Sequence, residues 1–291
     1  MNQRRALGSL LGIAIGDALG APLEGGPPPA TPLKHYTSGG RFGLPAGHFT
    51  DDTLQAIAIA RSLIVCRGFS AEDAMRRLLD AFLSAGHLFG PTSSTVFRLI
   101  TGGGSIREAV IEAHQRNGGS RTNGSVMRGF PVGIYYCDPT EVYRISMECS
   151  SLTHLDPVAG ESSAFANLMV SRLCRGDRRS SAYKKAIACC RIPEVRHVLE
   201  NFRAYRPAPS LDALGALHCA LFHLMDAESF EDALYRAVNM GGDADTIGAI
   251  CGALAGACWG IDGIPAHLLE GLHRRHEIMR LAEDLWSVSK G

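Results

Sequence analysis

The sequence has no excess of charge of either sign. Lys and Arg number 29 among its 291 residues, Asp and Glu also number 29, and the pI is about 7.2. Proteins that bind nucleic acid or anionic membranes usually carry a basic excess or a basic patch. We therefore expect neither nucleic acid nor a membrane as a partner, and a monomer is the default expectation.

Signals for export, for a membrane anchor and for disulfide bonding are also lacking. The N-terminal apolar stretch contains Asp17, which leaves no uncharged run of about 18 residues, and no small-residue cleavage pattern accompanies it. The nine cysteines form no Cys-x-x-Cys pair and are odd in number, which fits neither a disulfide framework nor a thiolate zinc site. Adjacent Cys189 and Cys190 fit buried small hydrophobes better than a redox pair. We expect a cytoplasmic protein with reduced thiols.

Charge runs and low-complexity tracts, which typically mark linkers between domains, do not occur. With 46% hydrophobic and 20% charged residues, the chain can bury one large core, and a single domain over residues 1–291 is expected. Apolar residues recur at helical spacing, which predicts an almost wholly α-helical protein. The predicted helices are 3–20, 52–67, 71–84, 105–115, 140–150, 157–175, 181–190, 194–203, 211–226, 230–238, 245–260 and 265–288. The segment 21–49 is long for a loop, which favours a functional role.

Two of the predicted helices carry a glycine at every fourth position. One series is Gly8, Gly12, Gly16 and Gly20, and the other is Gly248, Gly252, Gly256 and Gly260. This spacing places each series along one helix face, where the missing Cβ atoms let another backbone approach closely. Each glycine costs about 1 kcal/mol of helix propensity relative to alanine, so packing must compensate. We expect both glycine faces to be buried centrally, with the two helices packed against each other.

Two groups of acids stand immediately before apolar helices. One group is Thr50, Asp51 and Asp52, and the other is Asp243, Asp245 and Thr246. N-capping explains each group taken alone, because Thr and Asp are favoured there and negative charge suits the helix dipole. Two such pairs exceed what two caps require, and clustered buried carboxylates need a neutralising cation. Oxygen ligands favour Mg²⁺, Mn²⁺ or Ca²⁺ over zinc, and four Asp carboxylates can hold two such ions.

Other polar residues are weaker candidates when each is taken alone. Asp17, inside an apolar helix, is expected to be hydrogen-bonded to a loop backbone, because a buried carboxylate needs partners. Glu24 lies on the long loop, where an acid is usually only solvated. The Asn-Gly-Ser sequence at 123–125 fits an ordinary turn, or a turn whose N–H groups hold a phosphate. His154 fits a surface or core histidine better than a site residue.

Five segments in this order resemble the ADP-ribosylglycohydrolases over nearly the whole chain. They are GSLLGIAIGDALGAPLEG, GHFTDDTLQAIAIARSL, NGSVMR, SLTH and NMGGDADTIGAICGALAG. The resemblance implies a compact, all-α, orthogonal multi-helix bundle with a binuclear Mg²⁺ or Mn²⁺ centre in a cleft. It also implies hydrolysis of the bond between ADP-ribose and a modified group.

Carried over by position, the resemblance assigns metal ligands, catalytic groups and substrate contacts. The metal ligands are Thr50, Asp51, Asp52, Asp243, Asp245 and Thr246. The catalytic groups are Glu24 and Asp52, and Glu24 is favoured as the base because a tightly ligating carboxylate is not a free base. The substrate contacts are Gly90, Thr92, Asn123, Gly124, Ser125, Met127 and His154.

Two positions depart from the family pattern. Thr122 stands where the phosphate loop commonly has a glycine, and Leu88 stands where the activating glycohydrolases have an acid. The role of that acid is therefore not transferred to this chain. The expected function is metal-dependent removal of ADP-ribose from a modified protein side chain, with ADP-ribosyl-arginine favoured and ADP-ribose as the product. The alternatives are hydrolysis of a small ADP-ribosylated molecule and non-catalytic ADP-ribose binding.

Overall fold

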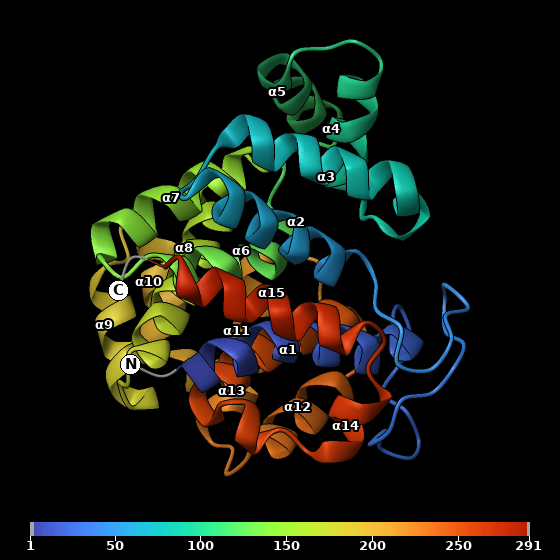
Figure 1. The fold of residues 1–291 in the computed structure, drawn as a ribbon, viewed down its shortest axis with the longest axis vertical. Helices are drawn as coiled ribbons and strands as arrows, with labels where there is room; N and C mark the ends of the chain where they lie inside the picture. Colours follow the sequence, from blue (N-terminus) through green and yellow to red (C-terminus); the bar gives the residue numbers. More distant parts are fainter. Residues whose placement is uncertain (1–2, 290–291) are drawn as a thin grey trace.

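The computed structural model of the protein describes residues 3–289 (Figure 1). The helices are α1 (Gln3–Gly20), α2 (Asp51–Cys66), α3 (Ala71–Ala85), α4 (Pro91–Thr101), α5 (Ile106–Arg116), α6 (Gly124–Tyr135), α7 (Pro139–Ser151), α8 (Pro157–Cys174), α9 (Arg179–Ala188), α10 (Pro193–Glu200), α11 (Ala213–Met225), α12 (Phe230–Val238), α13 (Ala244–Trp259), α14 (Ala266–Gly271) and α15 (Arg275–Ser287). Between residues 3 and 289 there is no strand, only the isolated bridges Gly39–Leu44 and Thr122–Asp212. The prediction of an almost wholly helical protein is confirmed.

The helix boundaries correct the sequence-based prediction at three places. Helices α4 and α6 were not predicted, and the predicted helix 265–288 is two helices, α14 and α15. Helix α6 contains Pro131 and several glycines, which lower its intrinsic propensity, yet every residue from Ser125 to Tyr135 is buried. Packing therefore overrides propensity in this segment. The break before α15 falls at Arg274, whose φ of 56° places it in the left-handed region.

Helices α1 and α13 pack against each other along their glycine faces, as predicted. A Cβ added at Gly12 would lie 2.0 Å from the carbonyl oxygen of Gly252, and one added at Gly16 would lie 1.9 Å from that of Gly248. The pairing is antiparallel, so a Cβ at Gly20, the last residue of α1, would lie 2.2 Å from the Ala244 carbonyl oxygen at the start of α13. Only glycine permits backbones to approach this closely.

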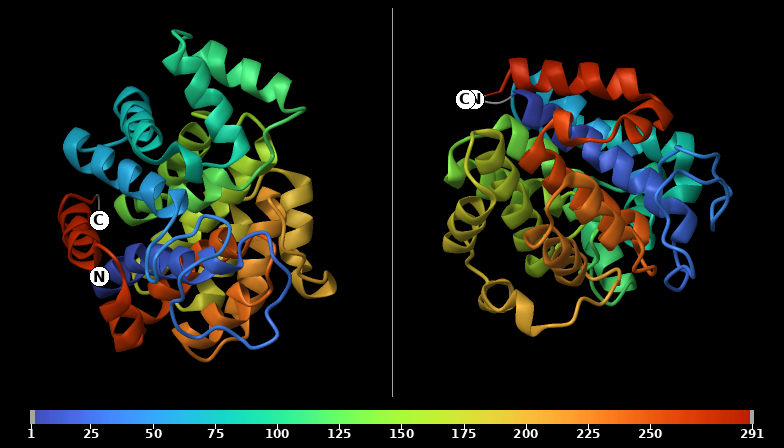
Figure 2. Two further views of the ribbon diagram at one scale, coloured as in Figure 1. Left: turned by 90° about the vertical axis from the view of Figure 1, so that its right-hand side faces the viewer. Right: turned by 90° about the horizontal axis from the view of Figure 1, so that it is seen from below.

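The α1–α13 pair lies at the centre of the molecule, and other helices cover it. Helix α15 packs against α1, and helices α4 and α5 project at the top of Figure 1. Buried apolar side chains form one continuous cluster that includes residues of both central helices. The long loop between α1 and α2 runs along one edge of the molecule, and this edge faces the viewer on the left of Figure 2. The ends of α1 and α13 that face this loop are those that carry the acids.

Helix α1 is apolar enough to resemble a membrane-spanning segment in composition. Within the segment Gln3–Leu23, an 18-residue window has a mean hydropathy of 1.5, but 89% of that window is buried inside the protein. Because its glycine face packs on α13, this burial is what a central core helix requires. Composition and length alone do not distinguish a membrane-spanning helix from a buried core helix.

We expect Gly12→Ala to destabilise the protein strongly. Alanine normally stabilises a helix by about 1 kcal/mol relative to glycine, but here the new methyl group meets a backbone carbonyl that cannot rotate away. The free energy of unfolding from urea titration should fall by about 3 kcal/mol or more. Gly90→Ala is the control, because a Cβ at Gly90 meets nothing within 4 Å. Equal stability of the two variants would contradict the close-packed contact.

Candidate metal centre

Acids from three separate segments meet at the junction of α1, α2 and α13. One carboxylate oxygen from each of Asp17, Asp52 and Asp245 lies within 4.8 Å of the other two. Glu24, Asp243 and Asp245 form a second group by the same measure. The two groups share Asp245, so the acids form one continuous cluster. The expected meeting of the two acid motifs, nearly 200 residues apart, is confirmed.

The residues immediately before α2 and α13 do not act as ordinary helix caps. Ser70, Asp138 and Asp212 accept hydrogen bonds from backbone N–H groups of the helices that they precede. Thr50 and Asp243 occupy the corresponding positions before α2 and α13, but neither side chain makes such a bond. The capping interpretation therefore does not account for these side chains, and their oxygen atoms are not used to cap the helices.

Asp17 holds the beginning of α2 in place. Its carboxylate accepts hydrogen bonds from the backbone N–H groups of Thr50 and Thr53, at 2.8 and 3.0 Å, and from their hydroxyl groups, at 2.8 and 2.6 Å. Its expected bond to a loop backbone is thereby confirmed. Burial raises the pKa of Asp17 to about 6, although the four hydrogen bonds oppose this shift. Asp17 thus joins the end of α1 to the acids of α2.

Glu24 is carried to the acids by the loop that follows α1. Gly25 donates a backbone hydrogen bond to the carbonyl of Gly242 at 2.8 Å, and Gly242 donates one to the carbonyl of Gly26 at 2.7 Å. The Glu24 side chain is only 10% exposed, and its carboxylate lies 3.7 Å from the guanidinium of Arg41. Gly242 has a φ of 63°, which the glycine at this position allows without strain.

Two buried carboxylate oxygens of the cluster have no hydrogen-bond partner among residues 3–289. They are Oε2 of Glu24 and Oδ1 of Asp52. A buried polar atom without a partner costs about 1–3 kcal/mol, and a cation would remove that cost. Every side-chain atom of the cluster that could bind a metal is an oxygen, which suits a hard divalent cation rather than zinc. The residues present therefore fit a divalent metal ion.

Burial, with a further contribution from neighbouring carboxylates, raises the pKa values of the acids in the cluster. Burial is the main cause for Asp51, Asp52 and Asp245, whose pKa values lie well above the ordinary range, and neighbouring carboxylates add to the shift. Burial, together with Asp245, raises the pKa of Asp243 to about 8. Without a cation, the cluster therefore keeps protons at neutral pH.

A buried arginine stands behind the cluster, and the sequence-based reasoning assigned it no role. Arg128 is fully buried and donates to Oε1 of Gln55 at 3.0 Å, while Gln55 donates to Oδ2 of Asp51 at 2.7 Å. The two hydrogen bonds that connect Arg128 through Gln55 to Asp51 orient the Asp51 carboxylate and bring positive charge near it. The sequence feature that could have drawn attention to Arg128 is the presence of a charged residue inside the apolar run VMRGFPVG.

A cavity of about 320 Å³ opens above the acids. The expected site residues that line it are Glu24, Asp51, Asp52, Gly90, Thr92, Asn123, Gly124, Met127, His154, Asp243, Asp245 and Thr246. Thr50 and Ser125 do not line it. Thr50 donates to Asp17 and, at 3.2 Å, to Asp52, whereas the Ser125 hydroxyl donates to the carbonyl of Ala159 at 3.5 Å. Arg41, Phe42 and Leu88 also line the cavity but were not among the expected contacts.

The Asn-Gly-Ser segment is the beginning of a helix rather than a turn. Asn123 is the residue before α6, Gly124 begins the helix, and the Asn123 amide donates to the carboxylate of Asp243. The contact links this segment directly to the acid cluster. A helix N-terminus offers free N–H groups to an anion.

Thr122, which departs from the family pattern, belongs to a hydrogen-bond network in the cavity wall. Its hydroxyl lies 2.9 Å from Nε2 of His154 and 2.8 Å from the hydroxyl of Thr92. The other ring nitrogen of His154 is 2.7 Å from the Thr153 hydroxyl. Burial, with a further contribution from Arg128, lowers the pKa of His154 well below its usual value. His154 is therefore a neutral, fixed imidazole near neutral pH.

Comparison with known proteins places the whole chain in one family. The family model for ADP-ribosylglycohydrolase matches residues 1–291, so the chain belongs to the ADP-ribosylglycohydrolase family and is a hydrolase of that class. It is 29% identical to the ADP-ribosylarginine hydrolase Tri1 of Serratia proteamaculans, over 98% of this chain and 80% of that protein. It is 28% identical to the ADP-ribosyl-[dinitrogen reductase] glycohydrolase of Rhodospirillum rubrum, over 98% and 96% of the two chains.

The fold is also that of a solved structure. An ADP-ribosylglycohydrolase-related protein complex contains a chain that superposes with a TM-score of 0.86 at 33% sequence identity, covering 99% of this chain and 98% of that one. The resemblance inferred from five short segments is thereby confirmed, as is the all-α fold of the ADP-ribosylglycohydrolase type.

We expect the metal-free protein to lose stability as the pH rises from about 5 to about 8. The unfolded carboxyl groups release their protons near pH 4, whereas Asp17 and Asp243 retain theirs until about 6 and 8. The folded state therefore binds more protons across this range, and each such group contributes a loss of up to about 1.4 kcal/mol per pH unit. Urea unfolding in the presence of a chelator measures the effect.

Two controls accompany this pH series. Excess Mg²⁺ at pH 8 should restore stability, because the cation binds the ionised carboxylates of the folded state. Asp243→Asn should reduce the slope, whereas Asp80→Asn on the exposed face of α3 should leave it unchanged. A stability that is constant or rises with pH in the chelator would show that these acids are not held protonated.

Proposed function

We propose that this protein removes ADP-ribose from a modified side chain, with ADP-ribosyl-arginine as the favoured substrate. The family supports hydrolysis at the ADP-ribose bond, and the name of the Rhodospirillum relative specifies an ADP-ribosylated protein. The arginine preference rests on the names of the Serratia relative and of a second ADP-ribosylarginine hydrolase from Pseudomonas putida. The observation that carries the proposal is the single acid cluster at the base of the cavity.

We propose that this cluster holds two Mg²⁺ or Mn²⁺ ions. The ligands are the six residues assigned by position, and Asp17 supports them through Thr50 without being a primary ligand. When bound, the ions would orient the ribose 2″ and 3″ hydroxyl groups and lower the pKa of a water molecule. The unpartnered Oδ1 of Asp52 supports this assignment.

Glu24 is the group that we propose as the general base. It comes from a loop rather than a helix, and its Oε2 atom is free to accept a proton from the attacking water. Asp52 also has a free oxygen but accepts a hydrogen bond from Thr50 on the other, as a fixed ligand does. Water then adds to C1″ of the ribose, the bond from C1″ to the leaving atom breaks, and the departing group takes up a proton.

The walls of the cavity are proposed to hold the rest of ADP-ribose. The N–H groups at the start of α6, around Gly124, are suited to the diphosphate. His154 is held neutral by burial, and both of its ring nitrogens are hydrogen-bonded to threonines, so its ring can contact the ligand without adding charge. Leu88 and Phe89 form an apolar part of the wall, so any acid that contacts a departing guanidinium must come from the cluster itself.

The state of the cysteines bears on the compartment in which the enzyme works. All nine cysteines are free, including the adjacent Cys189 and Cys190, which supports the proposal of a cytoplasmic protein with reduced thiols. A monomer remains our default proposal.

We expect the double variant Asp243→Ala, Asp245→Ala to lose both divalent-cation binding and release of ADP-ribose. Asp245 belongs to both groups of acids, so removing the pair leaves no complete set of ligands. Calorimetric titration with Mg²⁺ and with Mn²⁺ measures binding, and chromatography of released ADP-ribose measures turnover. The control is Glu72→Ala, Asp80→Ala on α3, which should retain both properties. A cluster variant that still binds Mg²⁺ and releases ADP-ribose would disprove the mechanism.

We expect release of ADP-ribose from ADP-ribosyl-arginine to exceed release from ADP-ribosyl-serine and from O-acetyl-ADP-ribose. The three substrates share ADP-ribose and differ only in the leaving group, so the comparison isolates the cavity mouth. Product analysis with Mg²⁺ and with Mn²⁺ measures the rates. Preferential cleavage of O-acetyl-ADP-ribose would favour a small-molecule hydrolase. Binding of ADP-ribose without any release would favour a non-catalytic role.

A further inference from the structure

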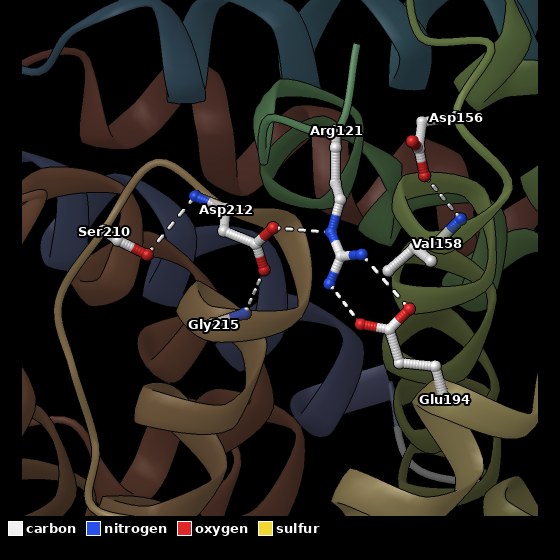
Figure 3. Close-up of polar contacts among 7 residues, drawn as sticks. All are labelled: Arg121, Asp156, Val158, Glu194, Ser210, Asp212 and Gly215. Carbon is white, nitrogen blue, oxygen red and sulfur yellow. Dashed lines mark hydrogen bonds and ion pairs between the residues drawn. The ribbon is translucent and has the colours of Figure 1, made fainter. Parts of the chain in front are cut away.

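Arg121 joins three segments of the chain that meet beside the cavity. Its Nε atom donates to Oδ2 of Asp212 at 2.7 Å, and its two terminal nitrogens donate to the two oxygens of Glu194 at 3.1 and 2.6 Å (Figure 3). Glu194 lies on α10 and Asp212 is the residue before α11. One planar guanidinium thus joins both helices to the segment that leads into α6.

The backbone beside Arg121 repeats this connection. The carbonyl of Arg121 accepts a hydrogen bond from the N–H of Ala213 at 2.9 Å, and the N–H of Asn123 donates to the carbonyl of Leu211 at 2.9 Å. Thr122 and Asp212 form the antiparallel bridge between these two bonds. The segments 121–123 and 211–213 are therefore fixed in register with each other.

Both paired segments continue directly into the cavity. On one side, Thr122 contacts His154, and Asn123 contacts Asp243 of the acid cluster. On the other side, Leu211 lines the cavity with 48% of its surface exposed. Arg121 itself is not among the cavity-lining residues, so it touches the wall only through its neighbours.

The side chains around Arg121 suit a role in position rather than in overall stability. Arg121, Glu194 and Asp212 have side chains that are 37%, 50% and 37% exposed, and ion pairs exposed to this degree contribute little to unfolding free energy. Asp212 uses its other oxygen to accept from the N–H of Gly215 at 2.8 Å, which fixes the direction of its carboxylate. The arrangement needs the three coplanar donors of an arginine, which a lysine does not have.

We propose that Arg121 is a positioning residue for ADP-ribose binding, setting the distance between the α6 start and the Leu211 side of the cavity. The proposal rests on the proposed function, because it takes Thr122, Asn123 and Leu211 as the wall that the ligand meets. Arg121 makes no contact with the reacting atoms. Its loss affects binding of ADP-ribose while leaving the acid cluster able to hold a cation.

We expect Arg121→Gln to raise the dissociation constant of ADP-ribose and KM about tenfold, with kcat and Mg²⁺ affinity within about twofold of the unmodified protein. Arg121→Lys should have a dissociation constant for ADP-ribose between those of Arg121→Gln and the unmodified protein, because lysine keeps the charge but not the three coplanar donors. Arg144→Gln on α7, which breaks an exposed ion pair with Glu148, is the matched control and should change nothing. Calorimetry with ADP-ribose in Mg²⁺, steady-state kinetics and thermal melting are measured on the full chain.

Glu194→Gln keeps the proposal testable where Arg121→Gln folds poorly. It weakens the same contact from α10 without altering the cavity segment, and it should raise the dissociation constant about threefold. ADP-ribose affinity within twofold for both Arg121→Lys and Glu194→Gln would overturn the proposal, as would a parallel loss of ADP-ribose and Mg²⁺ affinity. Turnover by the unmodified protein tests the proposed function, whereas ratios between variant and unmodified protein for ADP-ribose test Arg121, so the two can fail separately.

Discussion

The contact on which this structure depends is the one between the glycine faces of α1 and α13. Backbone carbonyls of each helix occupy the space that a side chain on the other would need, from Gly8 against Gly256 to Gly20 against Ala244. Because the helices are antiparallel, the last turn of α1 meets the first turn of α13. Asp17 and Asp245 are therefore brought together by a register that the glycines fix. The acid cluster is a consequence of this packing.

The rest of the site compensates for the electrostatic cost of that packing. Asp17 is satisfied by four hydrogen bonds from α2, and Asp51 is connected through Gln55 to the buried Arg128. Glu24 and Asp52 each retain one buried oxygen without a partner. Buried carboxylates normally have their oxygens satisfied, so these two atoms mark the place where a ligand completes the fold. The cluster is thus unfavourable in isolation, and it becomes favourable once a cation is bound.

The cavity wall is held together by different interactions from those that hold the acid cluster at its base. Most of the acids lie at buried helix ends, and Glu24 is held against them by the backbone hydrogen bonds of the loop that follows α1. The wall combines the segments around Thr122 and Leu211 with residues of α4 and α6. Hydrogen bonds of Thr122 hold it in place, and the half-exposed ion pairs of Arg121 lie behind it.

The sequence by itself determined the helical class, the two glycine faces and the pairing of two acid motifs, because periodicity and residue type carry this information locally. It did not reveal α6, whose Pro131 and glycines argue against a helix that only its buried surroundings stabilise. Nor did it reveal the roles of Arg128, Thr122 and Arg121, since each acts through partners distant in the chain. Tertiary structure alone decided that Ser125 faces Ala159 while Leu88 lines the cavity, because side-chain direction depends on what the finished fold places opposite.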